Sequence, residues 1–484
     1  MNSSVCLLAA EVAPLSKTGG LADVAGALGK YLVAAGRDVR LFTPLYASID
    51  RGRFPMQPLD GLQNVPLQVG PHHYVFSVAT TTLPGSEALV YLVDCPVLFA
   101  RASIYTTDPD EHLRFLSFTR AVLATCRRMQ WSPGILHCND WHTAFAPLFV
   151  KVLFEGDPLF ANTRSVLTIH NIGYQGIFSS TAIADLELGP KSYLLHQDDL
   201  RAGRINPLRH GILYADAITT VSPTHAREIC TDQYGMGLQD SLRMREEALT
   251  GILNGVDYQI WDPRNDAYLP EHYGPHTLAI KAGLKSAFID RLGLKTPVAT
   301  PLAGMVSRLA AQKGIELMFD SLPQVLEWRE LGFVALGSGE PQYERFLAEL
   351  QRRFPGRVVF RQGYDDELSH WIEAACDMFL MPSLYEPSGL NQMYSLRYGT
   401  VPIVRRTGGL ADSVTHYEPE TGEGTGIVFD EFNSEAFEGA LNTALELHAQ
   451  PEQWRRLVRN GMAQDFSWDR QGEKYLAIYT RLKG

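Results

Sequence analysis

The sequence predicts an α/β protein made of two Rossmann-like domains, each a doubly wound parallel sheet. Its 484 residues exceed what one compact core normally holds. Short apolar runs recur between helical stretches, and most are continuous, as in parallel strands covered by helices on both faces. A stretch over about 255–300, rich in Pro, Asp and Asn, interrupts this series. We therefore predict a domain boundary near its start, between residues 253 and 254.

The first unit can be justified residue by residue. After the apolar run at 5–10 comes a loop, and then Leu21, Val24, Ala25, Leu28 and Leu32 recur at helical spacing before Gly36. The next apolar run follows at once, so this segment predicts a β-loop-α-β unit. The predicted strands of the first half are 5–10, 38–43, 89–94, 135–138, 165–170 and 217–222. Those of the second half are 302–307, 333–337, 358–361, 378–382, 401–405 and 426–429.

Composition excludes several classes of protein. A net charge of -11 argues against a protein devoted to nucleic acid, although a few local cations could still hold a small anion. No uninterrupted apolar stretch reaches the roughly 18 residues of a membrane helix. The N-terminal apolar run lacks the basic segment that precedes the apolar part of a signal peptide, so we interpret it as a strand. The six cysteines are scattered without zinc-type spacing, which indicates reduced thiols and a cytoplasmic protein.

One short sequence occurs twice. Residues 17–24 read KTGGLADV and residues 406–414 read RTGGLADSV. We interpret this echo as a sign of two related halves with a shared role for the two motifs. A glycine pair that opens a helix lets a ligand approach free N–H groups, and Lys17 adds a charge, which suits a phosphate. A tight turn with a solvated lysine explains the pattern equally well. The motif is not a P-loop, because GxxxxGK[ST] is absent.

Two further loops follow predicted strands of the second half. Arg308 and Lys313 lie where a strand meets a helix, at the sheet edge where ligands bind in open α/β folds, so they could hold a diphosphate. A pair of surface charges is an equal alternative. Glu386 precedes a helix that ends at Gly399. From the residues alone, capping of that helix is favoured over binding of sugar hydroxyls or stabilisation of positive charge.

Polar and aromatic side chains cluster at two strand ends of the first half. The segments are 137–142 (HCNDWH) and 170–174 (HNIGY). This composition is typical of a sugar site, with hydroxyl partners and a stacking face. Three histidines on two loops could indicate a metal, but no Cys or HExxH spacing accompanies them, so a metal is the weaker interpretation. The DxD-like triplet Asp108-Pro109-Asp110 is interpreted as a plain loop.

Taken together and in order, these motifs resemble those of bacterial glycogen synthases and plant starch synthases. The matching segments, which span nearly the whole chain, are 17–21, 137–142, 168–171, 254–257, 307–314, 386–390 and 405–412. The resemblance implies a GT-B fold, in which two Rossmann-like domains face each other across a deep cleft. Residues 1–253 would form the acceptor-glucan side and 254–465 the nucleotide-sugar side. Residues 466–484 would carry a helix that packs back on the first domain.

The resemblance also implies an activity. Such enzymes transfer glucose from a nucleotide sugar to the non-reducing 4-hydroxyl of an α-1,4-glucan, with retention and without a metal or cofactor. ADP-glucose is the usual bacterial donor, and UDP-glucose is the alternative. The transfer would be a front-face substitution, in which Glu386 is not a covalent nucleophile. Partners would be the nucleotide sugar and glycogen or a maltooligosaccharide, with no nucleic acid and no membrane.

Roles for single residues follow from the same resemblance. Arg308 and Lys313 would hold the donor phosphates, with Lys17 reaching them from the first domain, which requires the two domains to close. Glu386 would be the essential carboxylate, and His170 would contact the donor glucose. The other expected donor-binding residues are Gly19, Gly20, Asn254, Leu390, Gly408 and Gly409. The expected sugar and acceptor residues are Asp140, Trp141, His142, Asn171 and Tyr174.

Three positions depart from wider patterns. Ser388 stands where many bacterial members have cysteine, so a thiol-reactive probe should miss this site. Pro207 stands where an aromatic or larger apolar residue is common. Tyr394 stands where wider retaining relatives have a second glutamate. Rival interpretations are a sucrose-type synthase, a glucan phosphorylase and a non-catalytic glucan-binding protein; the last would have no reason to keep Lys17, Arg308, Lys313 and Glu386 together.

Overall fold

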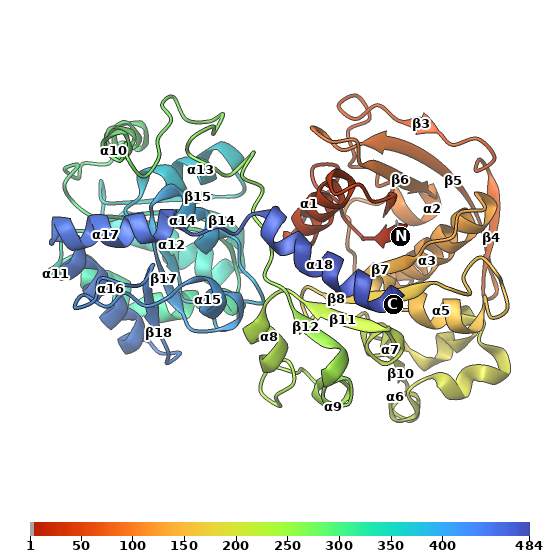
Figure 1. Cartoon of the computed structure of the whole chain (residues 1–484). Helices are drawn as coiled ribbons and strands as arrows, with labels where there is room; N and C mark the ends of the chain where they lie inside the picture. The colour runs from red at the N-terminus through yellow and green to blue at the C-terminus, as the bar shows by residue number, and fades with distance from the viewer. Residues whose placement is uncertain (1–3) are drawn as a thin grey trace. The chain divides into compact units, whose positions relative to one another are not determined.

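The computed structural model describes residues 4–484, which form two compact units. One unit extends to Gly255 and also contains Trp468–Gly484, and the other is Val256–Ser467. The sequence analysis placed these two boundaries at 253/254 and 465/466. Each unit contains one main β-sheet with helices around it (Figure 1).

The first unit has a sheet ordered β12-β11-β8-β7-β1-β2-β6-β5-β3, with β4 paired to β5. Its parallel strands are β1 (Val5–Leu8), β2 (Val39–Pro44), β6 (Leu89–Asp94), β7 (Ile135–Asn139), β8 (Arg164–Ile169), β11 (Ala217–Thr220) and β12 (Leu249–Gly251). The antiparallel edge consists of β3 (Gln57–Pro58), β4 (Val65–Val69) and β5 (His72–Thr82). The sequence analysis missed this edge because β4 alternates buried and exposed residues instead of forming a continuous apolar run.

The helices of the first unit pack around this sheet. They are α1 (Gly20–Ala34), α2 (Pro96–Phe99), α3 (Glu111–Arg128), α4 (Asp140–Thr143), α5 (Ala146–Val152), α6 (Gln197–Arg201), α7 (Pro207–Tyr214), α8 (Pro223–Glu228), α9 (Gln239–Arg243) and α18 (Trp468–Lys483). Short 3₁₀ helices lie at Ser180–Leu186, Gly189–Leu194 and Glu246–Ala248, and β9 (Phe178–Ser179) pairs with β10 (Arg204–Ile205).

The last helix, α18, belongs to the first unit and lies against α1. Buried His137 anchors it, because one ring nitrogen lies 2.6 Å from the Tyr479 hydroxyl and the other 2.6 Å from Thr168 Oγ1. Gly472 packs against the Tyr31 ring, where a Cβ would clash. His137 therefore serves the core of this unit instead of a strand-end site.

The second unit has a six-stranded parallel sheet ordered β15-β14-β13-β16-β17-β18. The strands are β13 (Leu302–Leu309), β14 (Gly332–Gly339), β15 (Val358–Gln362), β16 (Met378–Met381), β17 (Val401–Arg405) and β18 (Ile427–Phe429). The helices are α10 (Ala279–Leu292), α11 (Met318–Trp328), α12 (Pro341–Arg353), α13 (Asp366–Ala375), α14 (Asn391–Tyr398), α15 (Gly408–Ser413), α16 (Ser434–His448) and α17 (Pro451–Met462). Short 3₁₀ turns lie at Ala311–Lys313 and Ile315–Leu317.

Both sheets share one strand order. Counting parallel strands along each unit, the order 3-2-1-4-5-6 appears as β6-β2-β1-β7-β8-β11 and as β15-β14-β13-β16-β17-β18. This is the Rossmann order, which confirms the predicted fold class of the two halves. The order reverses beside the first strand, so the crevice for a ligand lies between the loops after strands one and four.

Strand order also corrects the interpretation of the repeated TGGLAD motif. The first copy follows β1, strand one of its sheet, whereas the second follows β17, strand five of its sheet. The two copies are therefore not equivalent loops. The true counterpart of 17–24 in the second unit is the segment formed by the end of β13, with Arg308, and the loop after it, with Lys313.

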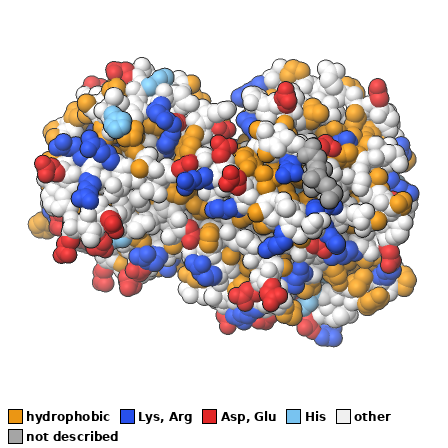
Figure 2. Space-filling model, viewed as in Figure 1, with side chains coloured by type: hydrophobic (Ala, Val, Ile, Leu, Met, Phe, Trp, Pro, Cys, Tyr) orange, Lys and Arg blue, Asp and Glu red, His pale blue; other side chains and the backbone are white. Residues whose placement is uncertain are grey.

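Surface properties agree with the composition. Acidic and basic side chains are interspersed on the face seen in Figure 2. Within residues 4–484, no helix has the length and apolar character needed to cross a membrane.

Candidate active site

Glu386 is the most firmly held of the predicted site residues. It lies in the loop after β16, at the switch point of the second sheet, and only 5% of it is exposed. Its Oε2 is 2.6 Å from Lys313 Nζ and accepts a hydrogen bond of 3.0 Å from Ser383 Oγ. The favoured interpretation of Glu386 as a helix cap is wrong, because α14 begins at Asn391 and its capping residue, Leu390, makes no side-chain cap.

The cations come from the end of β13, with Arg308, and from the loop after it, with Lys313. Lys313 is partly buried against Glu386, with a side chain 20% exposed, so it is not a plain surface charge. Arg308 is exposed at the end of β13, and its Nη2 donates to Gln312 Oε1 at 3.3 Å. Gln312 also joins the two loops, since its carbonyl accepts from Leu384 N at 2.9 Å. The fold therefore places Lys313 beside the buried carboxylate, whereas Arg308 is joined to Gln312 of the same loop.

Gly408 and Gly409 pack directly on the Glu386 loop. Gly409 N donates to the Glu386 carbonyl at 3.0 Å. A Cβ on Gly408, whose φ is +44°, would overlap that carbonyl oxygen, and a Cβ on Gly409 would overlap the carbonyl oxygen of Ser388. Close backbone approach thus requires both glycines. Beside them, Ser388 is buried, and within the described part of the chain its hydroxyl has no hydrogen-bond partner.

The glycine pair of the first unit has different surroundings. Gly19 caps α1 and Gly20 opens it, and the nearest atom to a Cβ on Gly19 would be Glu11 Oε1 at 4.0 Å. A Cβ on Gly20 would meet nothing within 4 Å. Lys17 pairs with Asp23 at 2.9 Å, and both side chains are substantially exposed. The N-terminus of this helix is therefore open to a ligand.

Glu11 is a residue that the sequence analysis missed. It follows β1 at the switch point of the first sheet and is 2% exposed. Its carboxylate accepts from Thr18 N and, at 2.9 Å, from Thr18 Oγ1, and it is also bonded to Tyr105. Burial raises its pKa, against the opposing effect of the Thr18 bonds. A glutamate directly after a buried strand, seven residues before the glycine loop, was the available signal.

Asp140 and His170 meet at the ends of β7 and β8. Asp140 is buried, adopts a left-handed φ of +51°, and its Oδ1 accepts from the backbone N–H of His170 at 2.7 Å and of Asn171 at 3.4 Å. Burial raises the pKa of Asp140 to about 7, although those two bonds oppose the shift. Burial lowers the pKa of His170 to about 3, so its ring is neutral at physiological pH.

The remaining predicted sugar residues surround this pair. His142 is buried and stacks on Tyr105, with ring centroids 4.9 Å apart. Trp141 lies against the backbone of Gly176, where a Cβ would overlap the indole. Asn171 Oδ1 accepts from Gly173 N at 2.9 Å, and Tyr174 is 56% exposed. Of these aromatic rings, Tyr174 is exposed, whereas His142 is buried and packs against Trp141 with ring centroids 4.2 Å apart.

The surroundings of Asn254, Pro207 and the triplet 108–110 differ from one another. Asn254 was assigned to the second domain, but it lies in the first unit, buried, with Oδ1 lacking a hydrogen-bond partner among the described residues. Pro207 occupies the first turn of α7, after the cap Asn206, where proline is favoured. Asp108 and Asp110 both pair with Arg101, at 2.6 and 2.5 Å, so this triplet is a salt-bridged loop.

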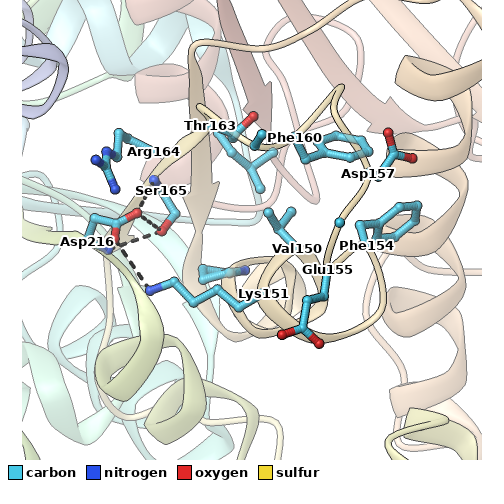
Figure 3. A pocket seen from close by; sticks show the side chains of 14 residues that line it. Val150, Lys151, Phe154, Glu155, Asp157, Phe160, Thr163, Arg164, Ser165 and Asp216 are labelled. Atoms are coloured by element: carbon cyan, nitrogen blue, oxygen red, sulfur yellow. Dashed lines mark hydrogen bonds and ion pairs between the residues drawn. The ribbon is translucent and has the colours of Figure 1, made fainter.

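Two hollows lie in the first unit. A wide one of about 730 Å³ is bordered by residues 101–108. It lies near Glu11, because Tyr105 lines it and is bonded to Glu11. A cavity of about 220 Å³ lies at the opposite ends of the strands, where β7 and β8 begin (Figure 3). Its Asp216 is already occupied by Ser165 N and Oγ, at 2.7 and 2.8 Å, and by Lys151 at 3.4 Å. No predicted site residue lines the second cavity.

Metal binding was the weaker interpretation of the histidines. Across residues 4–484, no group of three or more His, Cys, Asp or Glu side chains is placed to hold a metal ion. His137 and His170 instead hydrogen-bond to neighbouring side chains, and His142 packs in an aromatic cluster.

Comparisons with known proteins identify the family of this chain. Residues 4–244 match the model for the starch synthase catalytic domain, and residues 290–461 match that for glycosyl transferases group 1. A glycogen synthase from Anaeromyxobacter dehalogenans is 43% identical over 99% of both chains. One from Thermotoga maritima is 39% identical over 99% of this chain and 98% of its own.

Solved structures agree. The catalytic domain of starch synthase IV from Arabidopsis thaliana, bound to ADP and acarbose, matches with a TM-score of 0.92 and 34% identity over the whole of both chains. Sucrose-phosphate synthase from Thermosynechococcus elongatus matches with a TM-score of 0.62 at 17% identity over 99% of both, a likeness of fold alone. The two Rossmann-type sheets and these full-length matches show that the chain belongs to the glycogen and starch synthase family of GT-B glycosyltransferases.

Proposed function

We propose that this glycosyltransferase moves glucose from ADP-glucose to the non-reducing 4-hydroxyl of an α-1,4-glucan, with retention of configuration, in the cytoplasm. The observation that carries the proposal is the Lys313–Glu386 pair at the switch point of the second sheet. It is supported by the 34% identical starch synthase, whose structure contains ADP and acarbose. Neither a metal ion nor a cofactor is part of the proposal.

The donor would lie on the second unit. Arg308 offers a planar fork of donors and Lys313 a point charge, which together suit a diphosphate leaving group. Such fixed cations stabilise the charge that develops as the sugar–phosphate bond breaks. Because Lys313 and Ser383 occupy Oε2 of Glu386, we assign Oε1 to the sugar hydroxyls. Lys17 and the open N-terminus of α1 would add further positive potential.

The acceptor would lie on the first unit. Asp140 and Asn171 would supply hydrogen-bonding groups, and the rings of Trp141 and Tyr174 would supply stacking faces for sugars, with buried His142 packed against Trp141. Buried and neutral, His170 is suited to bond a hydroxyl rather than to neutralise phosphate. The acceptor hydroxyl would attack from the face on which the diphosphate leaves, and the leaving phosphate would take the proton. Glu386 forms no covalent bond in this scheme, so a trapped glucosyl-Glu386 adduct in mass spectrometry would refute it.

The decisive experiment incubates the protein with glycogen and either ADP-glucose or UDP-glucose. Nucleotide release and glucose incorporated into polymer are measured together. We expect incorporation from ADP-glucose that falls by more than about 100-fold in Glu386→Ala. The matched control is Glu446→Ala, which removes an exposed glutamate paired with Arg329 on the same unit and should leave the rate unchanged.

The alternatives give different outcomes. Incorporation from UDP-glucose alone would keep the reaction and change the donor. Nucleotide release without incorporation would point to another acceptor. Absence of both would refute the glycogen-synthase proposal. The anomeric proton coupling of the product, measured by NMR, tests retention.

A further inference from the structure

Asn139, the last residue of β7, lies between Leu8 at the end of β1 and His170 after β8. The sequence analysis gave it no role. It is 2% exposed and adjoins Asp140. We propose that Asn139 is a positioning residue that fixes the tautomer and the ring orientation of His170. Its consequence for glucosyl transfer rests on the proposed function, but the positioning itself can be tested without any substrate.

Hydrogen-bond direction carries the argument. The Asn139 side-chain nitrogen donates to the Leu8 carbonyl of β1 at 2.9 Å. A carbonyl oxygen only accepts, so the amide NH₂ must face Leu8 and the amide oxygen must face His170. That oxygen lies 2.8 Å from His170 Nε2. Because an amide oxygen also only accepts, Nε2 must carry the proton.

The charge state of the ring completes the assignment. Burial lowers the pKa of His170 to about 3, and a neutral imidazole carries a proton on one nitrogen only. Of the titratable neighbours, His137 and His142 also have pKa values lowered by burial. The Asp140 carboxylate accepts the backbone N–H of His170 at 2.7 Å. The lone pair therefore sits on Nδ1, which makes Nδ1 the acceptor of this ring.

Neighbouring contacts hold Asn139 in turn. Its backbone N–H donates to Thr143 Oγ1 at 2.7 Å, and Thr143 Oγ1 donates back to its carbonyl at 3.0 Å. Asn139 thus ties together the ends of three adjacent strands: β1 through Leu8, β7 through itself and β8 through His170. Rotation of its amide would place two oxygens face to face at Leu8. The alternative tautomer of His170 would place a lone pair against Oδ1. Both changes cost a buried hydrogen bond.

Function follows from the nitrogen left as acceptor. A sugar hydroxyl can donate to Nδ1 of His170 only in this tautomer. Loss of Asn139 would let the ring exchange tautomers and rotate, which would misplace the sugar. We expect glucosyl transfer in Asn139→Ala to fall by about 10-fold to 100-fold through kcat.

The direct test is NMR of protein carrying ¹⁵N-labelled histidine, without substrate, with the His170 signals identified by their loss in His170→Gln. We expect only the Nε2-protonated tautomer in the unsubstituted protein and a mixture of both in Asn139→Ala. The control Thr143→Val removes a buried hydrogen bond to the Asn139 backbone but leaves its amide in place, so it should keep one tautomer.

A second variant covers the case in which Asn139→Ala fails to fold. In Asn139→Asp the carboxylate loses the hydrogen bond to the Leu8 carbonyl but still accepts from Nε2. Its negative charge stabilises the imidazolium, so the ring should protonate at higher pH. Its transfer rate should then fall toward acidic pH and recover toward alkaline pH. An Nδ1-protonated His170 in the unsubstituted protein, or unchanged tautomer and pH profile in both variants, would overturn the proposal. Absence of transfer with an Nε2-protonated ring would refute only the proposed function.

Discussion

The two Thr-Gly-Gly loops contain the same tripeptide in opposite surroundings. Around Gly19 and Gly20 the space is open, and added Cβ atoms would meet no atom closer than 4.0 Å. Around Gly408 and Gly409 the backbone of the Glu386 loop fills that space. The first pair therefore leaves free space beside the backbone. The second pair is glycine because the Glu386 loop packs directly against it. An identical sequence pattern can therefore leave open space in one unit and pack against a loop in the other.

Among substitutions at the two glycine pairs, Gly409→Ala should have the largest effect. The new Cβ would overlap the Ser388 carbonyl, so the loop that carries Glu386 must move. We expect a loss of about 1–3 kcal/mol in unfolding free energy and a fall in kcat of about 100-fold. Denaturant unfolding and transfer rates measure the two effects. Unchanged stability and rate would show that the second pair is not required by packing.

Acid should destabilise the two units to different extents. For His137 and His170, the folded pKa of about 3 lies below the usual value near 6.5. The unfolded chain therefore binds more protons as pH falls from about 6.5 to about 3, and stability is lost over that range. The raised pKa of Asp140 acts oppositely, because its ionisation destabilises the fold as pH rises toward about 7.

The lowered pKa values of four buried histidines should outweigh the raised values of two carboxyl groups, so the first unit should weaken first in acid. The histidines are His137, His142, His170 and His210, and the carboxyl groups are those of Asp140 and Glu11. The expected change is several kcal/mol, at about 1.4 kcal/mol per pKa unit. Hydrogen exchange at pH 7 and pH 5 locates the loss. His137→Asn should flatten the acid slope, and loss confined to Val256–Ser467 would contradict the comparison.

Lys313 and Lys17 should contribute differently to the unfolding free energy. Lys313→Ala leaves the buried carboxylate of Glu386 without its cation, which should cost about 1–3 kcal/mol. Lys17→Ala removes an exposed pair with Asp23 and should cost less than about 1 kcal/mol. Both variants should weaken donor turnover. Thermal unfolding of the two variants side by side checks the difference, and equal losses would contradict it.

Gly20→Ala should have the smallest effect on folding. Its Cβ meets nothing, so stability should rise by up to about 1 kcal/mol through helix propensity. The KM for the nucleotide sugar should nevertheless rise severalfold, because the methyl group would occupy the space left for a ligand. The control Gly283→Ala lies on an exposed, open face of α10 and should stabilise the protein without changing KM. Equal KM values in both variants would count against a ligand at the first pair.

The sequence by itself determined the strands, the doubly wound class and the residues at the strand ends. Most predicted strands lie within two residues of the observed ones, because a strand buried on both faces must be continuously apolar. That requirement is local. The edge strands β3 to β5 escaped because one face of an antiparallel edge can remain polar.

Tertiary structure alone decided which side chains meet. Glu386 acquires Lys313 from 73 positions away, His137 turns to Tyr479 while His170 turns to Asn139, and Glu11 becomes the acceptor for Thr18. Such pairs depend on which strands lie adjacent and on how closely their loops approach. Local apolar periodicity contains no information about those distances, so a buried carboxylate and a helix cap have the same sequence pattern until the chain is folded.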